Sequence, residues 1–291
     1  MINQLTLEWL ESLGGWSRGF GDWPGVAAVM ARGERVEVIQ EVGCRLWKNS
    51  LLQGHSLCWD GDNLSVVKGR IWISFRHRRL LPASALPQVQ WHPKVLWIGI
   101  GCTGGTSRKV IESAIKQVCS SYHLALSAIA GIATIDTKAN ESGIIELCQG
   151  YNWHLKTFSA SVLNSVEVPH PSNIVVAKVG TKSVAEAAAL GAIELGYCPI
   201  VKNRQDACST NSEYGCGVGI LPTHERLLVP KQIFRAEEKA GCVTVAVAAC
   251  PIAHLRLDVT YPKSDRHSQI DQSSQKQRTK QLNQTKQAKN H

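Results

Sequence analysis

The sequence predicts an α/β protein: a layered C-terminal domain with a mostly parallel sheet, preceded by a smaller tryptophan-rich α+β region and followed by a disordered basic tail. Three observations predict this order. Short apolar runs alternate with helical patterns over residues 94–253, as in strands joined by crossover helices. Seven of the nine tryptophans lie in residues 1–93. The polar residues 254–291 carry too few apolar side chains to offset the entropy of ordering.

Composition and charge indicate where the protein is found and which partners it has. No apolar run reaches the roughly 18 residues of a membrane helix, and the N-terminus lacks the pattern of a secretory signal. We therefore expect a cytoplasmic protein without a membrane partner, with its ten cysteines reduced. Of the net charge of +9, residues 263–291 carry five, from seven Lys/Arg and two Asp. Such a tail is compatible with nucleic acid, but a solvated end is favoured.

The tryptophan-rich region is expected to be a partial domain. Residues 35–43 and 69–75 combine alternation with β-branched side chains, which favours strands. Trp9, Trp16 and Trp23 are spaced by seven, as on one helical stripe, yet the glycines between them argue against a continuous helix. So many indole rings need a surface to pack on, either the next domain or another chain.

A linker with three prolines, residues 81–94, leads into the layered domain. Ser183 is the expected N-cap of its clearest helix, with Glu186 placed as in a capping box and Gly196 as C-cap. Gly150 is expected to end an earlier helix. Residues 198–225 lack periodicity and form a loop insertion. We expect strands over 95–101, 126–136, 153–158, 226–230 and 243–249, and helices over 106–118, 141–150, 159–166 and 183–196.

The segment "GIGCTGGTS" joins the first strand of this domain to its first helix. Glycines there let backbone amides approach a ligand, and a helix N-terminus favours an anion, but a tight turn explains them equally well. The segment matches neither the dinucleotide fingerprint nor the P-loop, and no acidic residue follows at the distance that a nucleotide ribose requires. The candidate ligand-binding residues are Gly99, Gly101, Gly104, Gly105, Thr106 and Ser107.

Cys102 stands in the same loop, just before the helix. A helix N-terminus lowers a thiol pKa, so Cys102 is a candidate nucleophile. The sequence assigns it no histidine partner, and a small residue that shapes the loop is the favoured interpretation.

Two further segments are expected at the same edge of the sheet. Asp136, Lys138 and Glu141 follow a buried strand that ends near Thr134, either as an acid–base or carboxylate-binding site or as a surface ion-pair cluster. Lys231 lies at the end of a later strand. Together these groups suggest a ligand with more than one negative charge. The helix over 183–196 adds the hydroxyls and amides of Gly180, Thr181 and Ser183.

Metal ligation is not expected. The chain contains no CxxC pair, and the nearest group of ligand types has long, irregular spacings that favour free thiols in a loop. That group consists of Cys198, Cys208, Cys216 and His224.

A set of short words in fixed order resembles the CbiG/CobE family of cobalamin biosynthesis proteins. Over residues 95–249 the words are "GIGCTGGTS", "ATIDTKANE", "FSA", "PHPSNIV", "VGTKSVAEAAAL", "LLVPKQ" and "VTVAVA". Upstream, "VEVIQEVGCRLW", "GRIWIS" and "VQWHPKVLWIGIGC" look like the middle region of the longer CbiG-type proteins.

The resemblance implies a cobalt-precorrin-5A hydrolase, which opens a lactone on a macrocycle rich in carboxylates and releases acetaldehyde to give cobalt-precorrin-5B. Cobalt would belong to this anionic cobalt-corrinoid ligand, and no other cofactor is expected. Asp136 would activate water, and amides near Gly104–Thr106 would stabilise the oxyanion.

Two departures from the family pattern leave an alternative open. The chain lacks the "GGHxGGAN"-like word of the N-terminal domain, and the insertion over 198–225 is long. Either a separate CbiG-type N-terminal domain completes the hydrolase, docking on the tryptophan-rich start, or the chain is a non-catalytic accessory protein that delivers a corrinoid intermediate to a precorrin methyltransferase.

Overall fold

The computed structural model describes residues 6–14, 16–43, 45–51, 53–59, 67–80, 86–171, 183–195, 226–235 and 241–250. All of them fall within one compact unit, Met1–His254. The predicted insertion over 198–225 and the predicted tail over 254–291 lie outside the described residues. None of the described helices is long and apolar enough to cross a membrane.

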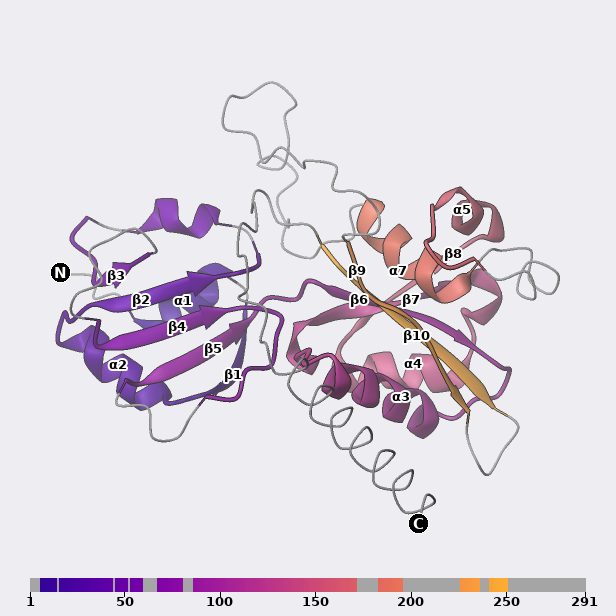
Figure 1. Ribbon diagram of the computed structural model, residues 1–291, viewed down its shortest axis with the longest axis horizontal. Coiled ribbons are helices and arrows are strands. Elements are labelled where there is room, and N and C mark those ends of the chain that lie inside the picture. Colours follow the sequence, from indigo (N-terminus) through magenta and orange to yellow (C-terminus); the bar gives the residue numbers. More distant parts are fainter. Residues whose placement is uncertain are drawn as a thin grey trace, which may run out of the picture. The chain divides into compact units, whose positions relative to one another are not determined.

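The first sheet has five strands in the order β1-β5-β4-β2-β3 (Figure 1). Strands β3, β2, β4 and β5 are parallel to one another. Strand β1 lies at one edge of the sheet and is antiparallel to β5. The strands are β1 (Ser17–Gly21), β2 (Val36–Gln40), β3 (Leu57–Cys58), β4 (Gly69–Ile73) and β5 (Gln88–His92), with helices α1 (Leu7–Gly14) and α2 (Trp23–Ala31) and the 3-10 helix η1 (Leu46–Ser50).

The tryptophans of this region pack on one another. Trp16, Trp47 and Trp91 are buried in one apolar cluster, and the Trp16 ring lies 5.3 Å from that of Trp47 and 5.2 Å from that of Trp91. The expectation that these rings need the next domain or another chain is therefore wrong for these three. Trp9 and Trp23 lie on separate helices, α1 and α2, so the spacing of seven does not form one helical stripe.

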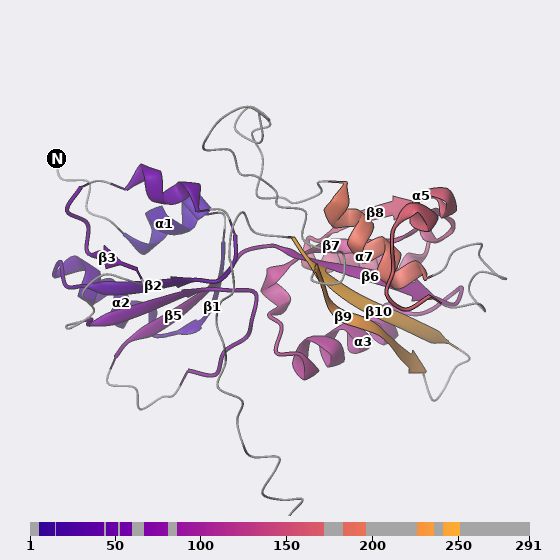
Figure 2. The same cartoon turned by 45° about the horizontal axis from the view of Figure 1, so that its top comes forward.

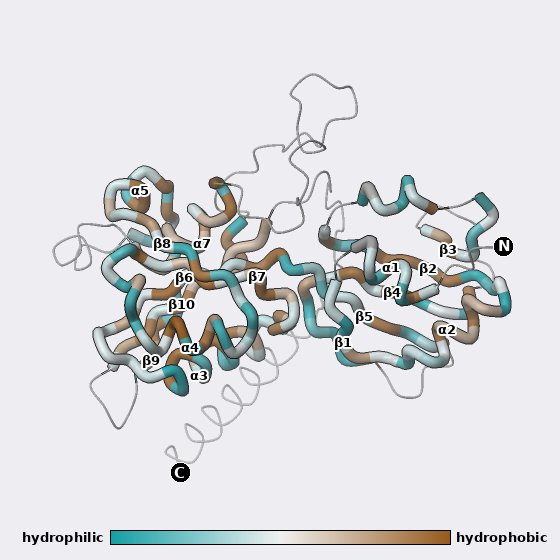
Figure 3. The backbone as a smooth tube through the Cα atoms, turned by 180° about the vertical axis from the view of Figure 1, so that it is seen from behind, coloured by the Kyte–Doolittle hydropathy of each residue, from teal (hydrophilic) through white to brown (hydrophobic). Residues whose placement is uncertain are grey.

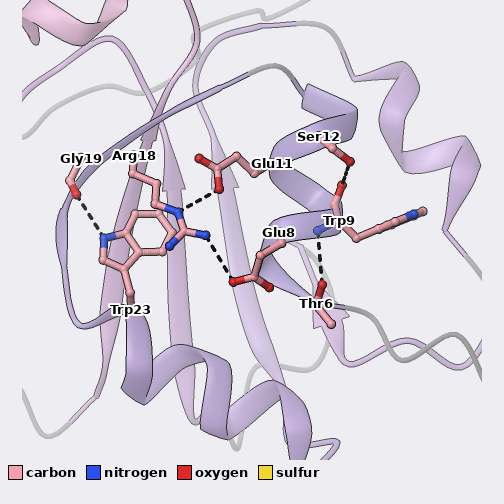
Figure 4. Close-up of polar contacts among 8 residues, drawn as sticks. All are labelled: Thr6, Glu8, Trp9, Glu11, Ser12, Arg18, Gly19 and Trp23. Atoms are coloured by element: carbon pink, nitrogen blue, oxygen red, sulfur yellow. Dashed lines mark hydrogen bonds and ion pairs between the residues drawn. The ribbon is translucent and has the colours of Figure 1, made fainter.

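Ion pairs join α1 to β1 (Figure 4). The Arg18 guanidinium lies 2.8 Å from the Glu11 carboxylate and 3.3 Å from that of Glu8. It also lies 4.8 Å from the centre of the Trp23 ring, whose indole N–H donates to the Gly19 carbonyl. These pairs each contribute little energy, and the buried side chains of Leu7 and Leu10 hold α1 in the apolar cluster.

The prediction of a linker over 81–94 is wrong in part, because Gln88–His92 forms β5. Val89 and Trp91 are buried, and β5 lies between β1 and β4. Pro87 and Pro93 flank this strand without interrupting its hydrogen bonds, so they mark its ends.

The second sheet has the order β8-β7-β6-β10-β9 (Figure 2). Strands β6, β7 and β8 are parallel, β10 is antiparallel to β6, and β9 is antiparallel to β10. The predicted layered α/β domain is confirmed, but its sheet is mixed, because two of its four strand pairs are parallel and two are antiparallel. Its strands are β6 (Leu96–Cys102), β7 (Ile129–Ile135), β8 (His154–Phe158), β9 (Leu227–Arg235) and β10 (Cys242–Ala249).

Helices cover both faces of the second sheet. Figure 1 shows α3 (Arg108–Ser121) and α4 (Ser142–Tyr151) on one face and α5 (Ala160–Ser165) and α7 (Val184–Glu194) on the other. Short 3-10 helices, η2 (Leu126–Ala128) and η3 (Asp136–Lys138), flank β7. The strands are largely hydrophobic in Figure 3, whereas α3 alternates between hydrophobic and hydrophilic residues, as expected for a helix with one face in the core.

Helix α7 approaches the sheet closely because small residues face each other. Alanines make up nearly half of α7, and every residue from Ala185 to Ile193 is buried. A Cβ added at Gly99 of β6 would stand 1.8 Å from the Ala185 carbonyl oxygen. Gly99 therefore permits the helix–strand contact that places the start of α7 beside the carboxyl end of β6.

One predicted helix boundary and one predicted capping interaction need correction. Helix α4 continues through Gly150 to Tyr151 and ends at Asn152, which adopts the left-handed conformation with φ of 53°. Ser183 is the N-cap of α7, but its side chain makes no capping bond, and the Glu186 carboxylate turns to other partners. The predicted C-cap Gly196 lies outside the described residues.

Candidate functional site

The glycine loop lies between the end of β6 and the start of α3. Thr103 and Thr106 stabilise it from within: the Thr106 hydroxyl donates to the Thr103 carbonyl at 2.8 Å, and the Thr103 hydroxyl accepts from the Cys242 N–H at 3.1 Å. Gly105 has φ of +74°, a conformation that favours glycine. Ser107 is the N-cap of α3, and its side chain makes no capping bond.

The four glycines of the loop segment have different roles. Gly99 permits close packing of α7, and a Cβ on Gly101 would stand 3.8 Å from the side chain of Val184 at the start of the same helix. Gly104 faces the Lys138 ammonium, 3.8 Å from the position of an added Cβ. Only the second half of the segment, Gly104 and Gly105, therefore lies beside the charged groups that follow β7.

A carboxylate of the chain itself already occupies this half of the loop. The Gly105 N–H donates to Glu141 Oε1 at 2.6 Å, and the Lys138 ammonium lies 3.1 Å from Glu141 Oε2. The Glu141 side chain is 11% exposed and that of Lys138 is 20% exposed. The loop amide and Lys138 together thus form a place that accepts a carboxylate and can be reached from solvent.

The Cys102 thiol is next to this place. Burial raises the pKa of Cys102, Lys138 lowers it to a smaller extent, and Glu141 raises it further. The net direction is upward, opposite to the lowering expected beside a helix N-terminus, so the thiol is protonated near neutral pH. The structure therefore offers no support for a thiolate nucleophile here.

The remaining candidates of this edge divide into exposed and buried groups. Asp136 is exposed at the start of η3, and among the described residues its carboxylate has no polar partner. Thr134 is fully buried and its hydroxyl donates to the Ile100 carbonyl at 2.7 Å, so it joins β7 to β6. Thr106 and Ser183 are also buried. Gly180 and Thr181 lie outside the described residues.

A second polar cluster surrounds Glu186, which is fully buried. Its Oε1 accepts from the Lys231 N–H at 3.0 Å and lies 3.1 Å from His170 Nδ1, and its Oε2 accepts from the His170 N–H at 3.3 Å. The Lys231 ammonium donates to the His170 carbonyl at 2.6 Å. Sequence reasoning selected Lys231 but missed His170, although the word "PHPS" that contains it carried part of the resemblance.

The group from Cys198 to His224, which the sequence favours as free thiols in a loop, lies outside the described residues. Within the ranges that are described, no group of three or more His, Cys, Asp or Glu side chains is arranged to hold a metal ion.

Two protein families match consecutive parts of the chain. The family described as "Cobalamin synthesis G C-terminus" matches residues 96–248, more than half of the sequence, and "Cobalamin biosynthesis central region" matches residues 13–93. The chain belongs to the CbiG family. The C-terminal match spans β6 to β10, and therefore includes the glycine loop, Glu141 and Glu186.

Among curated relatives, a cobalt-precorrin-5A hydrolase of Priestia megaterium is 34% identical to this CbiG-family chain over 102 residues. The match covers 35% of this chain and 27% of the hydrolase. The aligned part thus spans about a quarter of the length of that relative.

Three solved structures are similar to parts of the chain. CobE, a protein from the cobalamin (vitamin B12) biosynthetic pathway, is 22% identical, with a TM-score of 0.38, over 55% of this chain and 93% of its own. A putative cobalamin biosynthesis protein G homolog from Sulfolobus solfataricus is 16% identical, with a TM-score of 0.33, over 85% and 62%. Cobalamin biosynthesis protein chiG from Agrobacterium tumefaciens is 24% identical, with a TM-score of 0.33, over 53% and 98%.

Proposed function

We propose that this chain acts in cobalamin biosynthesis as the C-terminal part of a cobalt-precorrin-5A hydrolase. The observation that carries the proposal is the carboxylate-binding geometry at Glu141, formed by the Gly105 N–H and the Lys138 ammonium. The precursor is a polycarboxylate, so one of its side chains can take the place of Glu141. Cobalt arrives inside this substrate, and the proposal requires no other cofactor.

The proposed reaction begins with the addition of water to the lactone carbonyl. The carbonyl oxygen becomes an oxyanion, and the ring oxygen then leaves as an alkoxide. When that alkoxide becomes the carbonyl of acetaldehyde, the adjacent carbon–carbon bond breaks, and its electron pair passes to the macrocycle, which takes up a proton. The chain must therefore stabilise an oxyanion and move protons.

Displacement of Glu141 would provide an N–H donor that stabilises the oxyanion. Once a substrate carboxylate pairs with Lys138, the Gly105 N–H is free to donate to another oxygen. An N–H group fixed in a tight turn needs no reorganisation as charge develops, which is the property of an oxyanion hole.

Asp136 is the candidate residue for proton transfer from the attacking water. Its carboxylate is exposed at the same edge, two residues before Lys138, and no described group competes for it. It can accept a proton from the attacking water if the lactone lies above η3.

The test is a single incubation with cobalt-precorrin-5A, with and without a separately produced CbiG-type N-terminal domain, assayed for acetaldehyde and for the mass of the macrocycle. We expect Asp136→Asn to lower turnover by at least about 100-fold. Glu146→Gln, which removes an exposed carboxylate from the middle of α4, should leave turnover unchanged. Full activity in Asp136→Asn would remove Asp136 from the mechanism.

The alternative is a non-catalytic accessory protein that binds the corrinoid and delivers it to a methyltransferase. Asp136 favours it, because no described group holds its exposed carboxylate in place, as an efficient general base requires. Binding of the macrocycle without acetaldehyde in either incubation would support this alternative. Absence of both binding and acetaldehyde would contradict both functions.

A further inference from the structure

The contacts of Glu186 impose a specific state on the His170 ring. A carboxylate that is fully buried needs hydrogen-bond donors, and the three donors found here are the His170 N–H, the Lys231 N–H and His170 Nδ1. A carboxylate oxygen can only accept, so Nδ1 must carry the hydrogen. In the neutral ring this leaves the lone pair on Nε2.

His170 is also held through its backbone. Its N–H binds Glu186 Oε2, and its carbonyl accepts from the Lys231 ammonium at 2.6 Å. The ring, the amide and the carbonyl of one residue are therefore all fixed by two neighbours, one on α7 and one on β9. Such fixation restricts both the position and the rotation of the imidazole.

Exposure distinguishes this arrangement from a purely structural contact. A histidine that served only to satisfy a buried carboxylate would be expected to be buried with it. Here Glu186 is 0% exposed, whereas 56% of the His170 side chain is accessible. Among the described residues Nε2 has no polar partner, so the side of the ring that carries the lone pair is available to a ligand.

The strand register places this cluster level with Gly99 of β6, the strand that leads into the glycine loop. Lys231 lies between Val229 and Gln232, which pair with Val247 and Val245 of β10. Ala246, between those two, pairs with Gly99, where β6 meets the start of α7. The cluster is thus level with the residues that lead into the loop.

We propose that His170 is a proton-transfer residue of the site, and that Glu186 is its positioning residue. The identity of the substrate rests on the proposed function, but the state of the ring does not. Asp136 passes the proton of the attacking water to the leaving ring oxygen, and Nε2 then takes the proton of the resulting hydroxyl as the adjacent carbon–carbon bond breaks and acetaldehyde forms. The imidazolium gives this proton to the macrocycle carbon that receives the electron pair, so the ring is unchanged after each turnover.

The state of the ring can be measured without substrate by nitrogen-15 NMR of the histidine-labelled full chain at about pH 8, where an ordinary imidazole is neutral. The His170 signal is the one that disappears in His170→Asn. We expect a single tautomer with the hydrogen on Nδ1, and a mixed population in Glu186→Gln, because an amide can also donate. A wild-type ring with its hydrogen on Nε2, or a mixture of the two tautomers, would overturn the proposal.

Turnover separates catalysis from structure. The side-chain amide of His170→Asn can still donate to Glu186, but it has no group in place of Nε2. We expect kcat to fall about 100-fold or more with little change in KM, while His154→Asn on β8 behaves as wild type. In Glu186→Gln, we expect a smaller loss and a shifted pH profile.

The outcomes distinguish failure of this proposal from failure of the proposed function. If wild type releases acetaldehyde and His170→Asn is equally active, His170 is not a proton-transfer residue. If wild type releases none even with the N-terminal domain, the hydrolase proposal fails, and the NMR result still decides whether Glu186 fixes the ring with Nε2 as acceptor.

Discussion

Two glutamates, Glu141 and Glu186, each accept a backbone N–H from another segment, yet their surroundings differ. Glu141 is 11% exposed and pairs with a lysine ammonium that is also accessible. Glu186 is fully buried and is bound by His170 and by the Lys231 N–H. A ligand carboxylate can replace the first without exposing any buried group, but replacement of the second would leave N–H donors unsatisfied. The comparison indicates that one cluster is suited to exchange ligands and the other to hold a side chain in position.

The two clusters also depend on different layers. Glu141 is the N-cap residue of α4, which packs with α3 on one face of the second sheet. Glu186 is in the first turn of α7, on the other face. Changes that act on one layer should therefore affect one cluster more than the other.

The largest expected effect is from Gly99→Ala, which acts on the α7 layer. Its Cβ would stand 1.8 Å from the Ala185 carbonyl oxygen, and backbone atoms cannot move aside cheaply. We expect the free energy of unfolding to fall by about 3 kcal/mol, measured by urea unfolding. Amide hydrogen exchange should accelerate in α7 more than in α4.

Gly105→Ala is the matched control, because no atom lies within 4 Å of its added Cβ. Its φ of +74° still makes alanine unfavourable, so we expect a loss of about 1 kcal/mol. A loss in Gly99→Ala no larger than that in Gly105→Ala would show that the contact with α7 does not require glycine at residue 99.

A smaller effect is expected at high pH, and it acts on the other layer. Burial raises the pKa of Cys148 on α4 to about 11 and that of Cys119 on α3 to about 12, from an ordinary value of 9.0. The folded state therefore keeps protons that the unfolded chain releases. Stability should be unaffected below about pH 9 and fall above it by about 1.4 kcal/mol per pH unit for each thiol.

Urea unfolding between about pH 8 and 10.5 measures this slope, with Cys148→Ala as the comparison. Removing the thiol should remove its share of the slope. Hydrogen exchange in the same range should report opening of α3 and α4 before α7. An unchanged slope in Cys148→Ala would mean that other groups cause the loss.

The smallest expected effect on stability, within about 0.5 kcal/mol, is from Glu141→Gln, because its carboxylate is partly exposed and its ion pair is screened. Its effect on binding should be larger. Without the negative charge that occupies the loop, affinity for a carboxylate-rich porphyrin, followed by its absorbance, should rise several-fold. Unchanged or weaker binding would contradict the idea that ligand and Glu141 compete.

Much of the fold follows from patterns along the chain. The alternation of apolar runs and helical patterns predicted β6 to β10 and the layered α/β arrangement. Ser159 caps α5 with its hydroxyl, which accepts from the Val162 N–H. Errors occurred where a local signal had two explanations. Prolines that flank β5 were interpreted as a linker, and Glu186 was assigned to a capping box that its distant partners His170 and Lys231 prevent.

The sequence by itself determined the elements of this protein, their order and its family, because periodicity, caps and short motifs depend on neighbours in the chain. It also indicated that charged groups gather at the carboxyl ends of strands. Only the tertiary structure decided which of these groups meet. Glu141 is 36 residues from Gly105, and Glu186 is 45 residues from Lys231. Contacts over such separations depend on strand register and on how closely α7 packs against Gly99, and no local pattern specifies either.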